Sequence, residues 1–193
     1  MTLVLASSSP IRRAMLAAAG VDFEVASPQV DEAALKAEAL LTDDLALDLA
    51  KAKALSVSEG RIADWVVGSD SVITVQGRLF DKPADRKQAK EHLRFFSDKT
   101  IQLTGAVALA RNNAIDWSHA QTAALEVRPL SDRFIEAYLD TEWPEVSYCV
   151  GVFRIEGPGV QLFSRIDGDH FTILGMPLIP LLGALRERGL IAA

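Results

Sequence analysis

The chain has 193 residues, of which 49% are apolar and 24% charged, with a formal net charge of −6. This composition is typical of a globular protein, and the negative balance argues against a nucleic-acid groove as the main function. No apolar run approaches the roughly 20 residues that span a bilayer, and no basic segment followed by an apolar core predicts a signal peptide. The single cysteine, Cys149, excludes an intrachain disulfide. We therefore expect a cytoplasmic protein that binds neither nucleic acid nor membrane.

The N-terminus predicts a short strand, a serine-rich loop and a helix. Ser9 is expected to cap the helix, Pro10 to be its first residue and Gly20 to follow its end. A helix start presents unpaired N–H groups and the positive end of the dipole, which suits an anion. Arg12 and Arg13 oppose that dipole in the first turn, so a negative partner such as phosphate is indicated. On this stretch alone, an exposed turn with two surface arginines remains the alternative.

The next elements are a half-buried strand and a helix with a cation in its apolar stripe. The strand is predicted at Val21–Val25, where apolar and acidic residues alternate. Thr42 is expected to cap a helix running from Asp43 to about Ser58. Lys53 falls on the apolar face of that helix. The alternative to a functional cation there is a lysine that extends from the edge of the stripe to water.

Trp65–Val75 gives the strongest strand signal in the chain. Asp70 interrupts it with apolar residues on both sides. An unpaired carboxylate buried there costs several kcal/mol, so a metal, a cation or hydrogen bonds are expected beside it. An aspartate that caps a loop at the end of the strand is the alternative. Gln76-Gly77 predicts a tight hairpin turn, and Lys82 is held extended by the proline after it.

The remaining chain predicts helices and a long hairpin, with glycine-rich loops between Pro144 and Pro177. The expected elements are a helix at Ala84–Phe96, paired strands at Thr100–Ala110 and Ile115–Val127, a helix from the cap Ser131 through Asp140, and a final helix at Leu178–Arg188.

Six short motifs follow one another in a specific order. They are Ser7-Ser8-Ser9-Pro10 with Arg12-Arg13, Asp31-Glu32, Lys53-Ala54, Gly68-Ser69-Asp70-Ser71, Lys82-Pro83 and Gly175-Met176-Pro177-Leu178. Together they resemble the Maf family, the septum-formation-inhibitor-like nucleoside triphosphate pyrophosphatases, over essentially the whole chain. The resemblance implies one domain, residues 1–193, with a Maf/ITPase-like α/β fold: an extended mixed β-sheet, flanking helices and two lobes around a central cleft.

The resemblance also implies an activity and its requirements. Members hydrolyse a nucleoside triphosphate between its α- and β-phosphates, which gives the monophosphate and pyrophosphate. A divalent metal cation, Mg²⁺ or Mn²⁺, is expected as cofactor, and a homodimer is expected because members are often dimers. A nucleotide-binding regulator of cell division and septum formation without significant turnover is one alternative. A phosphatase that removes single phosphates is another.

The functional positions of the family match this chain residue by residue. The resemblance implies that the catalytic residues are Glu32, Lys53, Asp70 and Lys82, and that Glu32 and Asp70 are the metal ligands. It implies that the substrate-binding residues are Ser7, Ser9, Ile11, Arg12, Ser71 and Glu156. Arg13 lies just beyond the motif and is added as a further cation for the triphosphate. The chain departs from the usual motifs at Ile11, commonly Arg in the family, and at Ser71, commonly Thr. Both positions differ between branches of the family and bear on substrate choice.

Glu156 is the position that addresses the base. The branch resembling dTTP and UTP pyrophosphatases commonly has Gln there, before Gly157. A carboxylate offers only acceptors, which suits the adjacent N1–H and N2–H₂ donors of guanine. The segment Cys149–Gly157 also resembles the branch that acts on 7-methyl-GTP. We therefore expect a guanine-type triphosphate, 7-methyl-GTP included, as the substrate, with a dTTP/UTP pyrophosphatase as the alternative. The other role for Glu156 is a simple ion pair with Arg154 or with another cation at the rim of the cleft.

Overall fold

The computed structural model of the protein describes residues 2–38 and 44–192. They group into two compact units: Met1–Ser71, Thr104–Gln121 and Asp169–Ala193 form the first, and Val72–Leu103 and Thr122–Gly168 form the second. Within the described part of the chain, no helix is long and apolar enough to cross a membrane.

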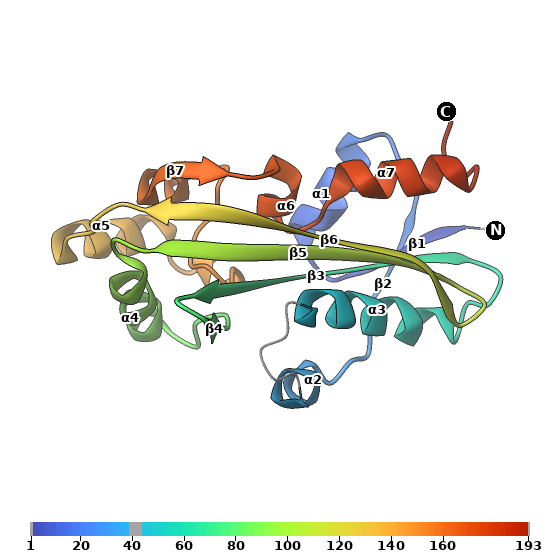
Figure 1. The fold of residues 1–193 in the computed structure, drawn as a ribbon, viewed down its shortest axis with the longest axis horizontal. Coiled ribbons are helices and arrows are strands. Elements are labelled where there is room, and N and C mark those ends of the chain that lie inside the picture. The colour runs from blue at the N-terminus through green and yellow to red at the C-terminus, as the bar shows by residue number, and fades with distance from the viewer. Residues whose placement is uncertain (1, 39–43, 193) are drawn as a thin grey trace. The chain divides into compact units, whose positions relative to one another are not determined.

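The helices and strands are shown in Figure 1. In chain order they are β1 (Leu3–Ala6), α1 (Pro10–Ala18), β2 (Glu24–Ala26), α2 (Glu32–Glu38), α3 (Leu45–Ser58), β3 (Trp65–Val75), β4 (Arg78–Phe80), α4 (Arg86–Phe96), β5 (Thr100–Arg111), β6 (Ala114–Val127), α5 (Asp132–Glu142), the 3₁₀ helices η1 (Glu145–Tyr148) and η2 (Pro158–Leu162), β7 (Phe163–Asp167), α6 (His170–Leu174) and α7 (Leu178–Glu187).

The strands form one seven-stranded mixed sheet in the order β2-β1-β3-β5-β6-β7, with β4 added to β3. β1 runs parallel to β2 and β3, whereas β4 is antiparallel to β3 and β7 is antiparallel to β6. The mixed sheet and its flanking helices confirm the expected α/β class and the extended mixed β-sheet.

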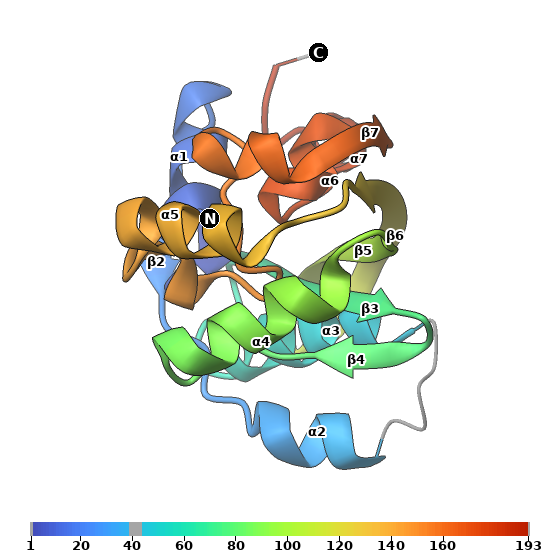
Figure 2. The same ribbon diagram turned by 90° about the vertical axis from the view of Figure 1, so that its left-hand side faces the viewer.

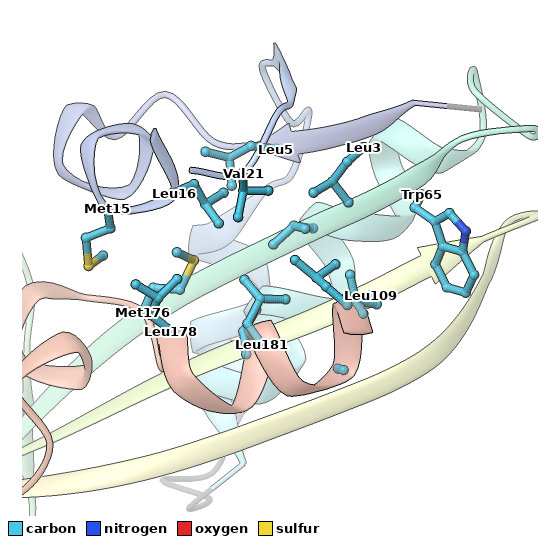
Figure 3. Close-up of a cluster of buried hydrophobic side chains, with 14 residues drawn as sticks. Leu3, Leu5, Met15, Leu16, Val21, Trp65, Leu109, Met176, Leu178 and Leu181 are labelled. Carbon is cyan, nitrogen blue, oxygen red and sulfur yellow. The ribbon is translucent and has the colours of Figure 1, made fainter. Parts of the chain in front are cut away.

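In the first unit, α1 and α7 cover one face of β1 and β3, and α3 covers the other (Figure 1). Because side chains alternate along a strand, Leu5 of β1 and Val67 of β3 point into the same core. Figure 3 shows this core, in which Leu16 of α1 and Leu181 of α7 complete the apolar contacts. The alternation then fixes where the polar residues of β3 point, since each successive residue changes face.

Several local predictions are confirmed by the structure. The hydroxyl of Ser9 caps α1 by accepting the backbone N–H of Arg12 at 3.5 Å, and Gly20 follows the helix with φ +70°. β3 spans Trp65–Val75 as predicted. The predicted cap Thr42 and the predicted first residue Asp43 lie outside the described residues, and the described helix α3 begins at Leu45.

The predicted strand at Val21–Val25 is wrong in its first half. β2 covers only Glu24–Ala26, because its pairing with β1 begins where Glu24 meets Val4. Val21 instead closes α1: its N–H donates to the carbonyl oxygen of Leu16 at 3.1 Å, and its side chain is buried in the core. A residue that terminates a helix and fills a core has the same apolar character as a strand residue.

In the second unit, α4 and α5 run side by side (Figure 2). Ion pairs join them, with Arg86 2.8 Å from Glu136 and Arg94 2.7 Å from Asp132. α4 begins at Arg86 rather than at the predicted Ala84, because the Asp85 carboxylate caps the helix by accepting the N–H of Gln88 at 2.7 Å.

Candidate functional site

A buried ion cluster in the first unit brings three of the predicted catalytic residues together. The Lys53 ammonium of α3 donates to Oδ1 of Asp70 at 3.0 Å and lies 2.8 Å from Oε1 of Glu32. Lys53 and Asp70 are buried, whereas the Glu32 side chain is 44% exposed. Lys53 is therefore a cation held by two carboxylates, and not a lysine that extends from the apolar stripe to water. Asp70 likewise has the cationic partner that its burial requires.

The close approach of α3 to β3 makes this cluster geometrically feasible. Gly68 and Asp70 share the face of β3 that α3 covers, because they are two residues apart. A β-carbon on Gly68 would stand 2.5 Å from the backbone nitrogen of Ala54, which leaves no room for a side chain. Glycine at this position thus lets the helix lie directly on the strand, with Lys53 level with Asp70.

Glu32 reaches Lys53 from the first turn of α2. Asp31 caps that helix, since its carboxylate accepts the N–H of Ala34 at 3.0 Å. The two residues of the acidic motif therefore have different roles: Asp31 caps the helix, and Glu32 forms an ion pair with Lys53. The position also suits Glu32 electrostatically, because a carboxylate is favourable at the N-terminus of a helix.

On the opposite face of β3, two serines converge on one backbone carbonyl. The hydroxyls of Ser69 and Ser71 donate to the carbonyl oxygen of Gly175 at 3.3 and 2.9 Å. Nε of Arg12 donates to the same oxygen at 3.0 Å, and its Nη2 donates to the Ser71 hydroxyl at 3.2 Å. Gly175 ends α6 with φ +114°, a conformation that favours glycine. The segment after α6 is thereby tied to both α1 and β3.

Arg12 adds a second positive charge close to the ion cluster. Its Nη2 lies 3.7 Å from Oδ1 of Asp70, and its side chain is only 11% exposed. Burial lowers the pKa of the Arg12 guanidinium, and the negative charges of Asp70 and Glu32 oppose that shift. An arginine stays charged under such conditions, so Arg12 contributes a fixed positive charge beside Asp70.

The other predicted residues of the N-terminal motif surround the start of α1. Ser7 is buried and its hydroxyl accepts the N–H of Ser9 at 3.1 Å. Ile11 is half-buried in the first turn, and Arg13 is exposed. Within the described residues Arg13 has no ion-pair partner, whereas Arg12 is committed to Gly175, Ser71 and Asp70. The two arginines are therefore in different situations although they are adjacent in the sequence.

Lys82 and Glu156 lie in the second unit, and both are exposed. The charges of both residues influence the pKa of the Cys149 thiol. Burial, the largest cause, and the negative charge of Glu156 raise this pKa to about 11, while the positive charges of Arg154 and Lys82 oppose the shift. In the described part of the chain, neither of them forms an ion pair.

Arg154 does not pair with Glu156. Its Nε and Nη2 bind the two carboxylate oxygens of Glu142 at 2.9 and 3.1 Å, in a bidentate arrangement. The Glu142 side chain is 3% exposed, whereas that of Arg154 is 35% exposed. The expected alternative role for Glu156, a simple ion pair with Arg154, is therefore absent from the structure.

The donor set at Lys53 fits a divalent cation. Glu32 and Asp70 point oxygen atoms at the same point in space, where the Lys53 ammonium lies. Mg²⁺ commonly binds one or two protein carboxylates and takes its other oxygens from water and substrate phosphates. No group of three or more His, Cys, Asp or Glu residues suited to a metal occurs among the described residues. The two carboxylates match a metal that arrives with a phosphorylated ligand.

Sequence reasoning assigned no site role to Gly175, Ser69 or Glu142. The contribution of Gly175 is a carbonyl oxygen, and a backbone atom leaves no residue-type signal. Ser69 stood beside Asp70 in the motif, and its two-residue spacing from Ser71 was the available signal. Glu142 pairs with a residue twelve positions later across an irregular segment, a pairing that no local periodicity reveals.

Comparison with known proteins agrees with the motif order. The family model described as Maf-like protein matches residues 2–188. A protein of Rhizobium meliloti named 7-methyl-GTP pyrophosphatase is 45% identical over 99% of this chain and 98% of its own length. A protein of Nitrobacter hamburgensis named nucleoside triphosphate pyrophosphatase is 43% identical over 98% of this chain and 95% of its own. A second 7-methyl-GTP pyrophosphatase, from Brucella suis, is 43% identical over 96% of this chain and 95% of its own.

Proposed function

This chain belongs to the Maf family, and on that premise we propose that it is a nucleoside triphosphate pyrophosphatase. It hydrolyses the α–β phosphoanhydride and releases a nucleoside monophosphate and pyrophosphate. The observation that carries the proposal is the contact of the buried Lys53 with the buried Asp70 and with the partly exposed Glu32. Binding of a nucleotide alone does not need a buried carboxylate held in a fixed position, whereas hydrolysis does.

Asp70 is the residue proposed to act on water. Its ammonium partner Lys53 and the nearby Arg12 guanidinium hold its carboxylate in place. The oxygen of an attacking water forms a bond to phosphorus while the anhydride P–O bond breaks and pyrophosphate leaves. Asp70 orients this water and accepts its proton. Lys53 then balances the charge that develops on the phosphoryl oxygens.

Glu32 and Asp70 are the residues proposed to hold Mg²⁺ or Mn²⁺. Together with Lys53 and Arg12 they make a cluster of two positive and two negative charges, which does not attract a triphosphate strongly by itself. When bound, the metal supplies positive charge to the phosphoryl oxygens. This balance supports a metal-dependent reaction.

The triphosphate is proposed to bind at the start of α1. Ser7 and Ser9 shape the turn there by accepting the N–H groups of Ser9 and Arg12, and the positive end of the helix dipole lies at this turn. Arg13 is an exposed cation in this turn and is proposed to bind phosphate. Lys82 is proposed as a further phosphate-binding residue because it is an exposed cation without an ion-pair partner among the described residues. Arg12 contributes its charge and keeps Ser71 in position.

Glu156 is proposed to select the base. Its carboxylate is exposed and has no ion-pair partner in the described residues, so its acceptors are available. Adjacent donors at N1 and N2 of guanine match two carboxylate oxygens, whereas uracil and thymine present acceptors at the flanking positions. A 7-methylated guanine carries additional positive charge, which a carboxylate favours further. The names of the relatives from Rhizobium meliloti and Brucella suis support the same substrate.

Product identification tests the activity. The purified protein is incubated with 7-methyl-GTP, GTP, dTTP and UTP in Mg²⁺ or Mn²⁺, and nucleotide and phosphate products are separated. We expect monophosphate and pyrophosphate in equal amounts, and loss of both with excess EDTA. Orthophosphate as the first product would indicate a phosphatase, and binding without product would indicate a regulator.

The ranking of kcat/KM across the four nucleotides tests the base. We expect 7-methyl-GTP and GTP to rank above dTTP and UTP, and Glu156→Gln to reduce that preference. A parent protein that prefers dTTP or UTP would overturn the guanine proposal while leaving the pyrophosphatase proposal intact.

A further inference from the structure

The ion pair of Glu142 with Arg154 lies two residues from the residue proposed to read the base. The guanidinium of Arg154 lies beside the segment that carries Glu156, because a β-carbon on Gly157 would stand 4.0 Å from Nη2 of Arg154 and 3.8 Å from Oε2 of Glu142. The negative charges of Glu142, Glu156 and Glu145 all raise the pKa of Arg154, with the hydrogen bond to Glu142 as the largest cause. In the structure, both hydrogen bonds that the Arg154 guanidinium donates go to the Glu142 carboxylate. Glu156 remains unpaired although a cation is close to it in the chain.

The backbone between Cys149 and Glu156 is also held in one conformation. Val152 has φ +56°, which is strained for a β-branched residue. Its carbonyl oxygen accepts the Tyr138 hydroxyl at 2.9 Å, and Tyr138 lies one turn before Glu142 on α5. Two side chains of α5 therefore hold the segment: Tyr138 binds it at Val152, and Glu142 binds it at Arg154.

The space around Arg154 is closed on its backbone side as well. A β-carbon on Gly159 would stand 2.5 Å from the Arg154 carbonyl oxygen and 2.7 Å from its nitrogen, so η2 packs directly against the backbone at this residue. The backbone of Arg154 is therefore fixed, and only its partly exposed guanidinium retains freedom to change partner.

We propose that Glu142 is a positioning residue for base selection: by binding Arg154 through both carboxylate oxygens, it keeps the guanidinium from neutralising Glu156. This inference rests on the proposed function, because it assumes that Glu156 reads the base. Free of Arg154, the Glu156 carboxylate has its acceptors available for two donors of guanine. With Arg154 released, the same carboxylate would be occupied by a cation and would no longer discriminate between bases.

A rescue experiment separates this role from simple stabilisation. Glu142→Gln removes the charge that holds Arg154, so we expect the ratio of kcat/KM for GTP to that for UTP to fall at least about tenfold, toward the ratio of Glu156→Gln. The change should appear mainly in KM for guanine nucleotides. Arg154→Gln in the same chain removes the freed cation, so the double variant E142Q/R154Q should recover the ratio of the parent to within about threefold.

The matched control is Glu136→Gln on the same helix. Glu136 also pairs with an arginine, Arg86, 2.8 Å away, and that pair joins α5 to α4 rather than to the segment of Glu156. Its GTP-to-UTP ratio should equal that of the parent. If Glu142→Gln does not fold, Arg154→Lys replaces it: lysine lacks the bidentate geometry, so the cation is held less firmly and the ratio should fall.

The outcomes are distinct for the two proposals. An unchanged ratio in Glu142→Gln, or a double variant as unselective as the single one, would overturn the role of Glu142. A parent that releases no pyrophosphate, or a ranking that Glu156→Gln leaves untouched, would instead overturn the proposed function on which it rests.

Discussion

Gly68 of β3 and Ala50 of α3 meet backbone to backbone: a β-carbon on Gly68 would stand 2.1 Å from the Ala50 carbonyl oxygen. A helix normally keeps the distance that its own side chains and those of the strand impose. Here the strand has no side chain at the point of contact, and the helix therefore lies close enough for Lys53 to reach Asp70.

Gly68→Ala should separate these two elements. We expect a loss of about 2–3 kcal/mol in the free energy of unfolding, because added methyl groups in a packed contact force backbone shifts. We also expect turnover to fall more than nucleotide binding, since Lys53 would move away from Asp70. Denaturant unfolding and steady-state kinetics measure both. The control is Gly183→Ala in α7, where a β-carbon meets nothing within 4 Å and helix propensity alone predicts a small gain. Equal stability of the two variants would contradict the close contact.

Asp70→Asn keeps the shape of the side chain and removes its charge. We expect kcat to fall by about 10²–10⁴, since neither proton transfer nor metal binding survives, while nucleotide affinity is largely retained. Pyrophosphate release and equilibrium binding of the nucleotide measure the two effects. Asp140→Asn, an exposed aspartate of α5, is the control and should be unaffected. Activity of Asp70→Asn within a few-fold of the parent would remove Asp70 from the catalytic set.

Arg12→Ala removes the hydrogen bond to Ser71 and the positive charge beside Asp70. A hydrogen bond to a charged group contributes roughly 1.5–3 kcal/mol, so we expect kcat/KM to fall by about 10- to 100-fold. Arg13→Ala should have a smaller effect, since Arg13 lacks the contact with Ser71 and the proximity to Asp70. Lys82→Ala should also weaken use of the triphosphate strongly. Measuring kcat/KM for the triphosphate at fixed ionic strength would compare the three variants.

The control for these arginines must be a truly exposed one. Arg111 is unsuitable because it is half-buried, with Cζ 5.2 Å from the centre of the Trp65 ring. Arg133→Ala is the better control, because that residue is exposed and belongs to no ion pair in the described chain. Similar small effects of Arg12→Ala and Arg133→Ala would rule out an anion site at the start of α1.

Cys149 should react slowly with alkylating reagents. Its pKa is raised to about 11, and only the thiolate is nucleophilic, so at pH 8 the native protein should react about a hundredfold more slowly than an unfolded chain with an ordinary thiol. The rate should rise with pH until about pH 11. The same shift means that the thiol stabilises the fold below about pH 9, and that this contribution is lost as the pH rises through the folded value. Mass spectrometry of iodoacetamide-treated protein across pH measures the rate, and a fast reaction at pH 7 would contradict the burial of the thiol.

The sequence predicted best where one local pattern determines the outcome. β3 matched its predicted bounds because its apolar and β-branched residues are buried on both faces. Gln76 and Gly77 both have positive φ, as a tight hairpin turn requires. Local patterns failed at Val21, whose apolar character serves the core after α1 rather than β2.

The candidate site was predictable in its residue types but not in its connections. The burial of Asp70 required a partner, and Lys53 stood out as a cation in an apolar stripe, yet neither pattern indicated that the two meet. The bond of Arg154 to Glu142 depends on how an irregular segment folds back on α5, which no periodicity reports. Likewise, the motif does not indicate that Arg13 is exposed while Arg12 is hydrogen-bonded to Gly175, because this difference depends on tertiary packing.

The alternation at the end of β3 limits how this protein can change over evolutionary time. Ser69 and Ser71 serve one face of the strand, and Asp70 serves the other. A single residue inserted or deleted before them would exchange the faces, so that the carboxylate would approach the Gly175 carbonyl and a hydroxyl would approach Lys53. Descendants of this chain must therefore preserve the number of residues along β3 as far as Ser71, in addition to the glycine at position 68 and the polar side chains that follow it.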